Sequence, residues 1–447
     1  MEKIVSLTKR RGFIFQGSEI YGGLAGTWDY GPLGVALKNN IKQLWWRHFV
    51  DSRDDMYGID SAILMNPKVW EASGHIAGFS DPLVEDKVTH KRYRADHLLE
   101  DAGIEADDKP VEELAKLIKE NNVKSPDGNE LTDVKQFNMM FKTSAGSVEG
   151  GDIDVYLRPE TAAGMFTNFK NILDSYHPKL PFGIAQVGRS FRNEIAPRDF
   201  IFRVRELEIM EFEYFIREEE WEKQFEYWRA QMHEWFKLLG FEKEDIKEVE
   251  IPKDGLAHYS KRTMDFYFNY PFGYKEIAGV AYRTDHDLSA HMKTSGVDLR
   301  YFDQQTGEKF VPHVMEPTFG FDRHIFAVIA KAFDVDEIDG NERTVLRFSK
   351  EVAPIKAAVF PLLKNKPELV SKAREVYEIL KKEVPQIMWD DNGNVGKRYR
   401  RQDEIGTPKC ITIDFDTLED DTVTVRDRDT GEQERAKIEE LFQMISA

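Results

Sequence analysis

The segment 183–215 constrains the fold more than any other stretch, and its sequence is GIAQVGRSFRNEIAPRDFIFRVRELEIMEFEYF. Its two halves alternate residue by residue around a charged loop, which predicts two β-strands joined as a hairpin. The alternation places Arg192 and Glu194 on one face of the first strand. On one face of the second strand it places Arg203, Arg205, Leu207, Ile209, Glu211 and Glu213.

A row of charges beside apolar residues on a sheet face is costly to bury without a ligand. The bidentate fork of an arginine suits a phosphate group, and a nearby carboxylate can accept a hydrogen bond from an amine. A solvated face with internal salt bridges is the alternative interpretation. The FRNE segment and the long second strand favour a ligand-binding face.

Length and charge limit the class of protein. At about 150 residues per domain, 447 residues indicate two or three units. The hydrophobic content of 41% is ample for a large core. The net charge of −18 argues against a protein that coats nucleic acid nonspecifically, although it allows a local basic patch.

Cys410 is the only cysteine, which excludes a disulfide framework and a cysteine-rich zinc site. Its setting, PKCITIDFD, predicts a buried structural residue, with a thiol nucleophile as the alternative. The N-terminus lacks the apolar region of a signal peptide, and no apolar run approaches membrane-spanning length. We therefore expect a soluble, cytoplasmic protein with no membrane partner.

Periodicity predicts a large N-terminal region interrupted by an insertion. A helix is predicted at 33–49, with an apolar stripe of Leu37, Ile41, Leu44, Trp45 and His48, and a strand at 59–65. The polar stretch 80–155, with a helix at 110–121, is predicted to interrupt a core sheet. The remaining elements expected there are a strand at 155–160, helices from 161 and at 217–240, strands at 263–270 and 276–283, and a strand–turn–helix unit at 310–333.

A polar loop is predicted near 335–350, where the composition changes. Beyond it we expect strands at 357–362, 410–415 and 422–426, a helix at 367–383 and a last helix ending at Met444. Alternating strands and helices predict a small α/β domain of about 100 residues.

Several motifs occur together in a known order. FRNE followed by RVRELEIMEFE resembles the second signature motif of class II aminoacyl-tRNA synthetases, and EPTFGFDR resembles the third. The helix at 33–49 with MNPKVWEASGH resembles the first, which packs the dimer interface. The segments SGHIAGFSDPLVED, VYLRPETAAGMFTNFKN, YRTDHDLSAH and YRRQDEIGTPKCITIDFD narrow the resemblance to glycyl-tRNA synthetases of the homodimeric type, from about Gly12 to the end.

The resemblance implies an α+β fold. A class II catalytic core, with an antiparallel sheet flanked by helices, is expected at 1–345, with an inserted subdomain at about 80–155. A C-terminal α/β anticodon-binding domain is expected at 350–447. The chain is expected to pair with itself as a homodimer.

The implied reaction joins glycine to ATP as glycyl-adenylate and then transfers glycine to the 3′ end of tRNA(Gly), as protein synthesis requires. By resemblance Arg192 holds the α-phosphate, Glu194 recognises the adenine amine, and Arg323 lies over the adenine or the γ-phosphate. Mg²⁺ is expected on the phosphates, with support from Glu276. The implied ATP-binding set is Arg192, Asn193, Glu194, Phe202, Arg203, Val204, Arg205, Glu206, Leu207, Glu276, Ile277, Gly320, Phe321, Asp322 and Arg323. A structural salt-bridge role for Arg205 or Glu206 remains open.

Glycine offers only an ammonium, a carboxylate and two Cα hydrogens, so selectivity must come from excluding side chains. By resemblance Glu160, Glu211 and Glu316 surround the ammonium; a capping role for Glu160 is the alternative. The implied glycine-binding set is Arg94, Glu160, Leu207, Glu208, Ile209, Met210, Glu211, Glu316, Pro317, Thr318, Phe319 and Gly320.

The chain departs from the family pattern at a few positions. Leu207 stands where the family usually has a phenylalanine that stacks on adenine, Thr318 replaces a usual serine, and Ala163 replaces a common glutamine. The cysteine pairs that many bacterial relatives carry in the insertion are missing, so no zinc site is expected. His90 and His97 are then expected to be surface or structural residues.

A basic cluster in the C-terminal region is expected to contact tRNA. It comprises Lys397, Arg398, Tyr399, Arg400 and Arg401, which combine charge with an aromatic ring as RNA recognition needs. A solvated charged loop is the alternative. For the whole chain, the alternatives are a non-catalytic nucleic-acid-binding paralogue of the synthetase fold and a synthetase for another small amino acid. Because Arg192, Glu194, Glu211 and Arg323 are all present, the paralogue is disfavoured.

Overall fold

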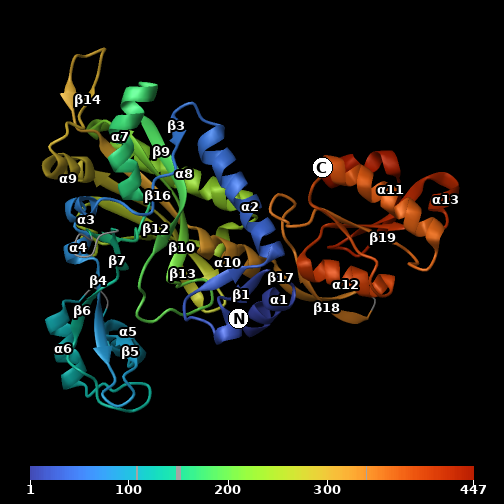
Figure 1. Ribbon diagram of the computed structural model, residues 1–447, viewed down its shortest axis with the longest axis horizontal. Helices are drawn as coiled ribbons and strands as arrows, with labels where there is room; N and C mark the ends of the chain where they lie inside the picture. Colours follow the sequence, from blue (N-terminus) through green and yellow to red (C-terminus); the bar gives the residue numbers. More distant parts are fainter. Residues whose placement is uncertain (107–108, 147–152, 339, 447) are drawn as a thin grey trace.

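The computed structural model describes residues 1–106, 109–146, 153–338 and 340–446. Figure 1 shows a large body built on one sheet, a lobe formed by residues 80–138 beside it, and a C-terminal unit on the other side. Among the described residues no helix is both long and apolar enough to cross a membrane.

The large body is organised around a seven-stranded sheet with the order β11-β12-β13-β16-β10-β9-β3. Its strands are β3 (Met56–Gly58), β9 (Phe182–Phe191), β10 (Glu206–Ile216), β11 (Ile246–Glu250), β12 (Arg262–Tyr270), β13 (Gly273–Thr284) and β16 (His313–Gly320). All neighbours are antiparallel except β3 and β9. The register places Glu211 opposite Gln186 on one side and Thr318 on the other, so these side chains share one face.

Helices cover both faces of this sheet (Figure 1). On one face, α2 (Pro32–Trp46), α8 (Trp221–Leu238) and α10 (Phe321–Ala332) bury a large aromatic core that contains Trp45, Trp228 and Phe319. The predicted stripe of α2 is confirmed at Leu37, Ile41 and Trp45, which are fully buried. On the other face, α7 (Ala162–Tyr176) and α9 (His286–Ser295) cover only part of the sheet and leave room for the site described below.

The insertion has a small core of its own. Strands β4 (Ser80–Glu85), β5 (Arg92–Arg94) and β6 (Lys135–Asn138) pair in the order β5-β4-β6, and α5 (Ala95–Asp101) and α6 (Val111–Glu120) pack on them. The hairpin of β7 (Lys142–Ala145) and β8 (Ile153–Tyr156) leads back to the body. The predicted strand at 59–65 is wrong: α3 (Pro67–Ala72) follows an irregular segment that makes one isolated bridge, from Leu64 to Leu157.

The charged end of the hairpin differs from the prediction. Strand β9 stops at Phe191 and β10 begins only at Glu206, so Arg192, Glu194, Arg203 and Arg205 lie in the connecting segment and not on strand faces. The alternation along β10 itself is confirmed, because Leu207, Ile209, Glu211 and Glu213 do share a face.

The predicted polar loop near 335–350 is also wrong. Strands β17 (Phe333–Ile338) and β18 (Asn341–Leu346) form a hairpin that packs along α12 (Val395–Ile405). Arg343 in β18 is buried and pairs with Asp336 at 2.6 Å and with Asp403 of α12 at 3.1 Å. The polar composition therefore reflects buried ion pairs, which an isolated sequence pattern cannot distinguish from a solvated loop.

The C-terminal unit is a five-stranded mixed sheet with the order β20-β19-β21-β22-β23. It consists of β19 (Ala357–Pro361), α11 (Pro367–Glu383), β20 (Ile387–Trp389), α12, β21 (Lys409–Ile413), α13 (Thr417–Asp420), β22 (Thr422–Asp427), β23 (Gln433–Lys437) and α14 (Leu441–Ser446). Cys410 is buried in β21, and burial raises the pKa of its thiol far above the usual range. The interpretation of Cys410 as a structural residue is thus confirmed.

Candidate active site

A cavity of about 120 Å³ opens at the end of the sheet where β10, β16 and α10 meet. Its lining residues are Arg192, Glu194, Ile201, Phe202, Arg203, Val204, Leu207, Glu208, Ile209, Glu276, Thr318, Gly320, Asp322 and Arg323. Most residues of the ATP-binding set predicted from the sequence therefore line this one cavity.

Arg323 forms one wall of this cavity from the first turn of α10. Its guanidinium lies over the ring of Phe202, 4.4 Å from the ring centre, and its Nη1 donates to Glu276 Oε2 at 2.9 Å. A flat cation facing a ring suits a planar aromatic ligand. The ring beside Arg323 is thus that of Phe202, so Leu207 does not leave the cavity without an aromatic wall.

Arg192 and Glu194 face the cavity from the turn after β9. Arg192 donates from Nε to the carbonyl of Pro159 at 3.1 Å, and neither of its terminal nitrogens is hydrogen-bonded within the described part of the chain. Glu194 is 9% exposed, and its Oε2 has no hydrogen-bond partner among the described residues; the nearest cation is Arg203 at 3.9 Å. A free guanidinium fork and an unpaired carboxylate oxygen are groups prepared for a polar ligand.

Arg205 has a structural role instead. Its Nε and Nη2 donate to the carbonyl of Glu194 at 3.2 and 3.0 Å, and its Nη1 donates to the carbonyl of Ala25 at 2.7 Å. These bonds hold the turn that carries Glu194. The structural alternative left open for Arg205 is therefore the one that the hydrogen bonds support.

Several other assigned residues have partners outside the cavity, although Glu208 also contributes to the lining. Glu206 pairs with the exposed Arg189, and Glu208 pairs with Lys38 of α2. Ile277, Met210, Phe319 and Phe321 are buried in the aromatic core. The backbone N–H of Asn193 donates to the carbonyl of Met139. Pattern matching names whole segments, but the alternation of a strand sends every second side chain to the opposite face.

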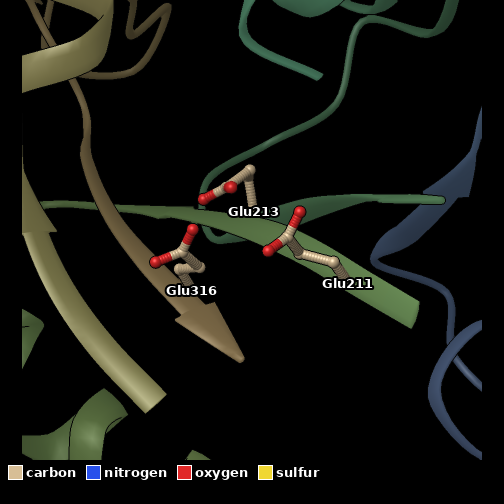
Figure 2. A group of neighbouring side chains, drawn as sticks. All are labelled: Glu211, Glu213 and Glu316. Atoms are coloured by element: carbon tan, nitrogen blue, oxygen red, sulfur yellow. The ribbon is translucent and has the colours of Figure 1, made fainter. Parts of the chain in front are cut away.

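The second part of the site is a cluster of carboxylates deeper on the same sheet face. Oxygens of Glu211, Glu213 and Glu316 lie within 4.8 Å of one another, and Figure 2 shows the three carboxylates gathered around a shared space. Glu211 accepts from the hydroxyls of Thr161 at 2.6 Å and Thr318 at 2.7 Å. Since Thr318 also lines the cavity, the two parts of the site are continuous.

Arg283 was missed by the sequence analysis and lies beside this cluster. It is 2% exposed, and it donates to Glu316 at 2.6 Å and to both oxygens of Asp287 at 2.8 Å. Its guanidinium also stacks on the ring of Tyr259, 3.7 Å from the ring centre. Arg283 lies at the end of β13 and Asp287 in α9, so no single periodicity in the sequence indicated this pair.

Glu160 approaches the cluster from the segment before α7. Its Oε2 lies 3.3 Å from Nε2 of His75, whose Nδ1 lies 2.8 Å from the hydroxyl of Ser73. Burial alone would raise the pKa of Glu160, but His75, followed by Arg283 and Arg192, lowers it to about 2. Glu160 is therefore ionised, and among the residues that the structure describes no side chain makes a capping hydrogen bond at the start of α7.

The pKa values of the other carboxyls in the cluster are raised. Burial, reinforced by Glu211 and Glu160, raises the pKa of Glu316 to about 8 despite the opposing effect of Arg283. Burial also raises the pKa of Glu211, and it raises that of Glu213 well above the usual range. A pocket that keeps several acidic groups close together in the absence of a ligand is typical of a functional site.

These shifts predict how stability depends on pH. Since the pKa of Glu316 rises on folding from 4.5 to about 8, the folded protein binds the proton more tightly. The protonated carboxyl of Glu316 makes its full contribution to the free energy of unfolding below about pH 4.5. This contribution is lost as the pH rises to about 8, at up to ~1.4 kcal/mol per pH unit. Thermal unfolding from about pH 6 to 8 should show a fall in melting temperature that is smaller in Glu316→Gln. Equal slopes in both proteins would contradict the shift.

Arg94 does not reach the carboxylate cluster. It donates to Asp81 at 2.6 Å and to both oxygens of Asp96 within the insertion. Burial lowers the pKa of Arg94, but Asp96 and Asp81, and after them Glu194, raise it. Arg94 is thus held within the insertion and is not among the residues that line the cavity, so its contact with glycine stays a prediction.

The basic cluster of the C-terminal unit lies on α12, so the alternative of a charged loop is wrong. Arg398 is 1% exposed and donates to the carbonyls of Pro361 and Gly393, while Tyr399 packs on Phe360. Their proposed contact with tRNA is therefore corrected to a structural role. The residues that line an open groove on this helix are Arg11, Asn394, Gly396, Lys397, Arg400 and Arg401.

Comparison with known proteins agrees with this geometry. The family described as tRNA synthetase class II core domain (G, H, P, S and T) matches residues 141–332, and the anticodon binding domain family matches residues 356–447. The glycine–tRNA ligase of Geobacillus thermodenitrificans is 51% identical over 450 residues, which cover 99% of this chain and 96% of the relative. This chain belongs to the glycine–tRNA ligase family. The glycine–tRNA ligase of Bacillus cereus is 50% identical and covers 99% of this chain and 97% of the relative.

The fold of this family member also resembles a solved structure. The Giardia lamblia prolyl-tRNA synthetase in complex with prolyl-adenylate superposes with a TM-score of 0.67 at 15% identity, covering 98% of this chain and 75% of that chain. The class II core and the C-terminal anticodon-binding domain predicted from the sequence are confirmed.

Proposed function

We propose that this chain is a glycine–tRNA ligase that activates glycine with ATP and transfers it to tRNA(Gly). One observation carries the proposal: Thr318 joins the cavity at Arg323 to a small, buried carboxylate pocket. The cavity at Arg323 suits a nucleotide. The carboxylate pocket suits the ammonium of an amino acid that is too small to need further space.

In the first step a carboxylate oxygen of glycine attacks the α-phosphorus of ATP, and the bond to the leaving pyrophosphate breaks. Arg192 offers two unpaired terminal nitrogens to the phosphate oxygens. Glu160 and Glu211 hold the ammonium and thereby fix the direction of the attacking carboxylate. In the second step a terminal ribose hydroxyl of tRNA attacks the glycyl carbonyl, and AMP leaves.

The adenine would lie between Phe202 and Arg323, which now contact each other directly. Entry of the base would require Arg323 to move away from the ring by about the thickness of a stacked aromatic, roughly 3.5 Å. Glu194, with its unpaired Oε2, could accept from the exocyclic amine.

Magnesium fits the carboxylates at the outer edge of the cavity. Glu276 is half-exposed on β13, and Asp265 lies on the neighbouring strand β12, where burial and then Glu276 raise its pKa to about 7. Carboxylates on neighbouring strands suit a hard divalent cation. The bound cation would neutralise negative charge on the phosphates of ATP. That zinc is not required stays a prediction.

We also propose two domains, 1–345 and 350–447, with the insertion at about 80–155, a homodimer and a cytoplasmic location. The dimer follows from the resemblance at 33–75, and the location from the role of tRNA charging in protein synthesis. Sedimentation of the purified protein at about twice the chain mass of 51.9 kDa would support the dimer.

The groove on α12 is the proposed tRNA surface. Charge reversal at Lys397, which is exposed, should raise the KM for tRNA(Gly) several-fold and reduce its salt dependence, because phosphate contacts are lost. ATP–pyrophosphate exchange should not change. Lys382→Glu, at the far end of α11, is the matched control and should leave the KM for tRNA within about twofold. If both variants behave alike, the groove is not the tRNA surface.

Aminoacylation tests the proposed function as a whole. The purified protein should attach radiolabelled glycine to a tRNA(Gly) transcript in an ATP-dependent reaction that releases pyrophosphate. The non-catalytic paralogue would bind tRNA without forming the ester. Absence of glycyl-tRNA from a folded preparation would therefore support that alternative.

A further inference from the structure

The loop between β1 (Ile14–Gln16) and β2 (Trp28–Tyr30) carries an apolar tip that the proposed reaction has not used. Ile20 is 89% exposed and Tyr21 is 87% exposed, the highest values among the large hydrophobic side chains of the described residues. Leu24 of the same loop is 57% exposed. Scattered single apolar side chains on a surface are ordinary, but three on one short loop form a patch that suits contact with another molecule.

The tip is held in shape by hydrogen bonds within the loop. The backbone N–H groups of Tyr21 and Gly23 donate to the carbonyl of Ser18 at 3.0 and 3.1 Å. The side-chain Nε2 of Gln16 donates to the carbonyl of Leu24 at 3.0 Å. The exposed side chains therefore belong to a fixed backbone conformation, so a partner can bind them at little cost in loop entropy.

The same loop is attached to the turn beside the cavity. Arg205 donates from Nη1 to the carbonyl of Ala25 at 2.7 Å and from its backbone N–H to the carbonyl of Gly26 at 2.8 Å. Arg205 also holds the turn that carries Glu194, which lines the cavity. Since Tyr21 precedes Ala25 by four residues, the backbone of the tip lies at most about 14 Å from this attachment.

Basic residues adjoin the tip on its other side. Lys9, near the end of the first helix, α1 (Glu2–Arg10), pairs with Glu19 in the loop. Arg10 and Arg11 share a single carboxylate on α12, which leaves one positive charge unbalanced. Arg11 also lines the groove on α12 that is the proposed tRNA surface. The loop is thus joined to that groove through α1 and to the cavity through its own last residues.

We propose that this tip binds the unpaired 3′ end of tRNA(Gly), with a base stacked on the ring of Tyr21 and with Ile20 packed beside it. This inference rests on the proposed function. Single-stranded RNA is bound mainly by aromatic rings that stack on its bases and by nearby positive charge. The net charge of −18 disfavours RNA over most of the surface, so an exposed ring between a basic groove and the cavity is the favourable place. A second copy of this chain is the alternative occupant.

Binding of a tRNA(Gly) transcript at fixed salt tests the inference. Tyr21→Ala should raise the Kd by at least about fivefold, because a stacked base is lost. Tyr21→Phe keeps the ring and should stay within about twofold of the wild type, whereas Tyr21→Leu keeps apolar area without a ring and should bind as weakly as Tyr21→Ala. With a transcript that lacks its unpaired 3′ nucleotides, all four proteins should bind with similar Kd. ATP–pyrophosphate exchange should not change, since the loop is attached through backbone carbonyls.

Tyr176→Ala is the matched control. Tyr176 is 64% exposed and is the last residue of α7, whose 15 residues span about 22 Å from the end beside Glu160. This substitution should leave the Kd for the transcript within about twofold.

Three results would overturn the inference: an unchanged Kd in Tyr21→Ala, an equal loss of affinity for the shortened transcript, or dissociation of Tyr21→Ala into single chains. The last result would identify the tip as a contact between two copies of this chain. Absence of glycine-dependent exchange in the wild type would instead contradict the proposed function.

Discussion

Arg192→Lys should lower glycine-dependent ATP–pyrophosphate exchange by at least about tenfold, which corresponds to ~1.4 kcal/mol of transition-state stabilisation. Arg192 donates through Nε to the carbonyl of Pro159 and lies over the ring of Phe79, and its two terminal nitrogens have no hydrogen bond among the described residues, so they remain available as a fork. Lysine keeps the charge but cannot bind two phosphate oxygens in that geometry. The loss should appear in kcat, because the charge on the phosphate develops during the reaction.

Arg189→Lys is the matched control for this experiment. Arg189 lies on the same hairpin, is more than half exposed, and pairs with Glu206 on the surface. Its substitution should leave exchange within about twofold, since exposed ion pairs contribute little. Near wild-type exchange in folded Arg192→Lys would remove Arg192 from the phosphate site.

Glu211→Gln should raise the KM for glycine by roughly 30- to 100-fold, or about 2–3 kcal/mol, and change the KM for ATP by less than about threefold. Glu211 is held by two threonine hydroxyls at 2.6 and 2.7 Å, so its carboxylate is fixed in the centre of the pocket. Glutamine preserves the shape and removes the negative charge that the ammonium needs. Steady-state exchange with each substrate varied in turn separates the two KM values.

Glu219→Gln provides the corresponding control, because Glu219 follows the same strand but its side chain is 70% exposed. It should leave both KM values within about twofold. A similar rise of both KM values in Glu211→Gln would indicate a general distortion of the sheet and not the loss of an ammonium ligand.

The sequence pattern predicted the parts of this site that regular structure determines. Alternation along β10 correctly grouped Ile209, Glu211 and Glu213, because a strand imposes its two-residue period on the side chains. The buried stripe of α2 and the bounds of α11 were predicted because a helix likewise imposes its own period on the side chains. The order of motifs identified the family, which the relatives at 50–51% identity confirm.

The errors occurred where contacts between distant segments override local pattern. Arg398 belongs to a strongly basic run, yet the carbonyl of the distant Pro361 and that of the nearby Gly393 accept its hydrogen bonds in the interior. The polar composition of the 335–350 segment predicted a loop, although Asp336 and Asp403 neutralise Arg343 in a packed hairpin. The turn at Arg192–Glu194 depends on Arg205 and the carbonyl of Ala25, so no periodicity could have placed it. These arrangements are properties of the tertiary structure.

ATP–pyrophosphate exchange with a panel of amino acids shows whether this site activates glycine and rejects larger amino acids. With glycine, alanine, serine and proline supplied in turn, we expect exchange with glycine and a kcat/KM for alanine lower by at least about 100-fold, because the methyl group would enter a closed pocket. Thr318, which bonds to Glu211 at 2.7 Å, helps to close that pocket. Comparable exchange with alanine or serine, or no exchange with glycine in a folded preparation, would contradict a site built for glycine.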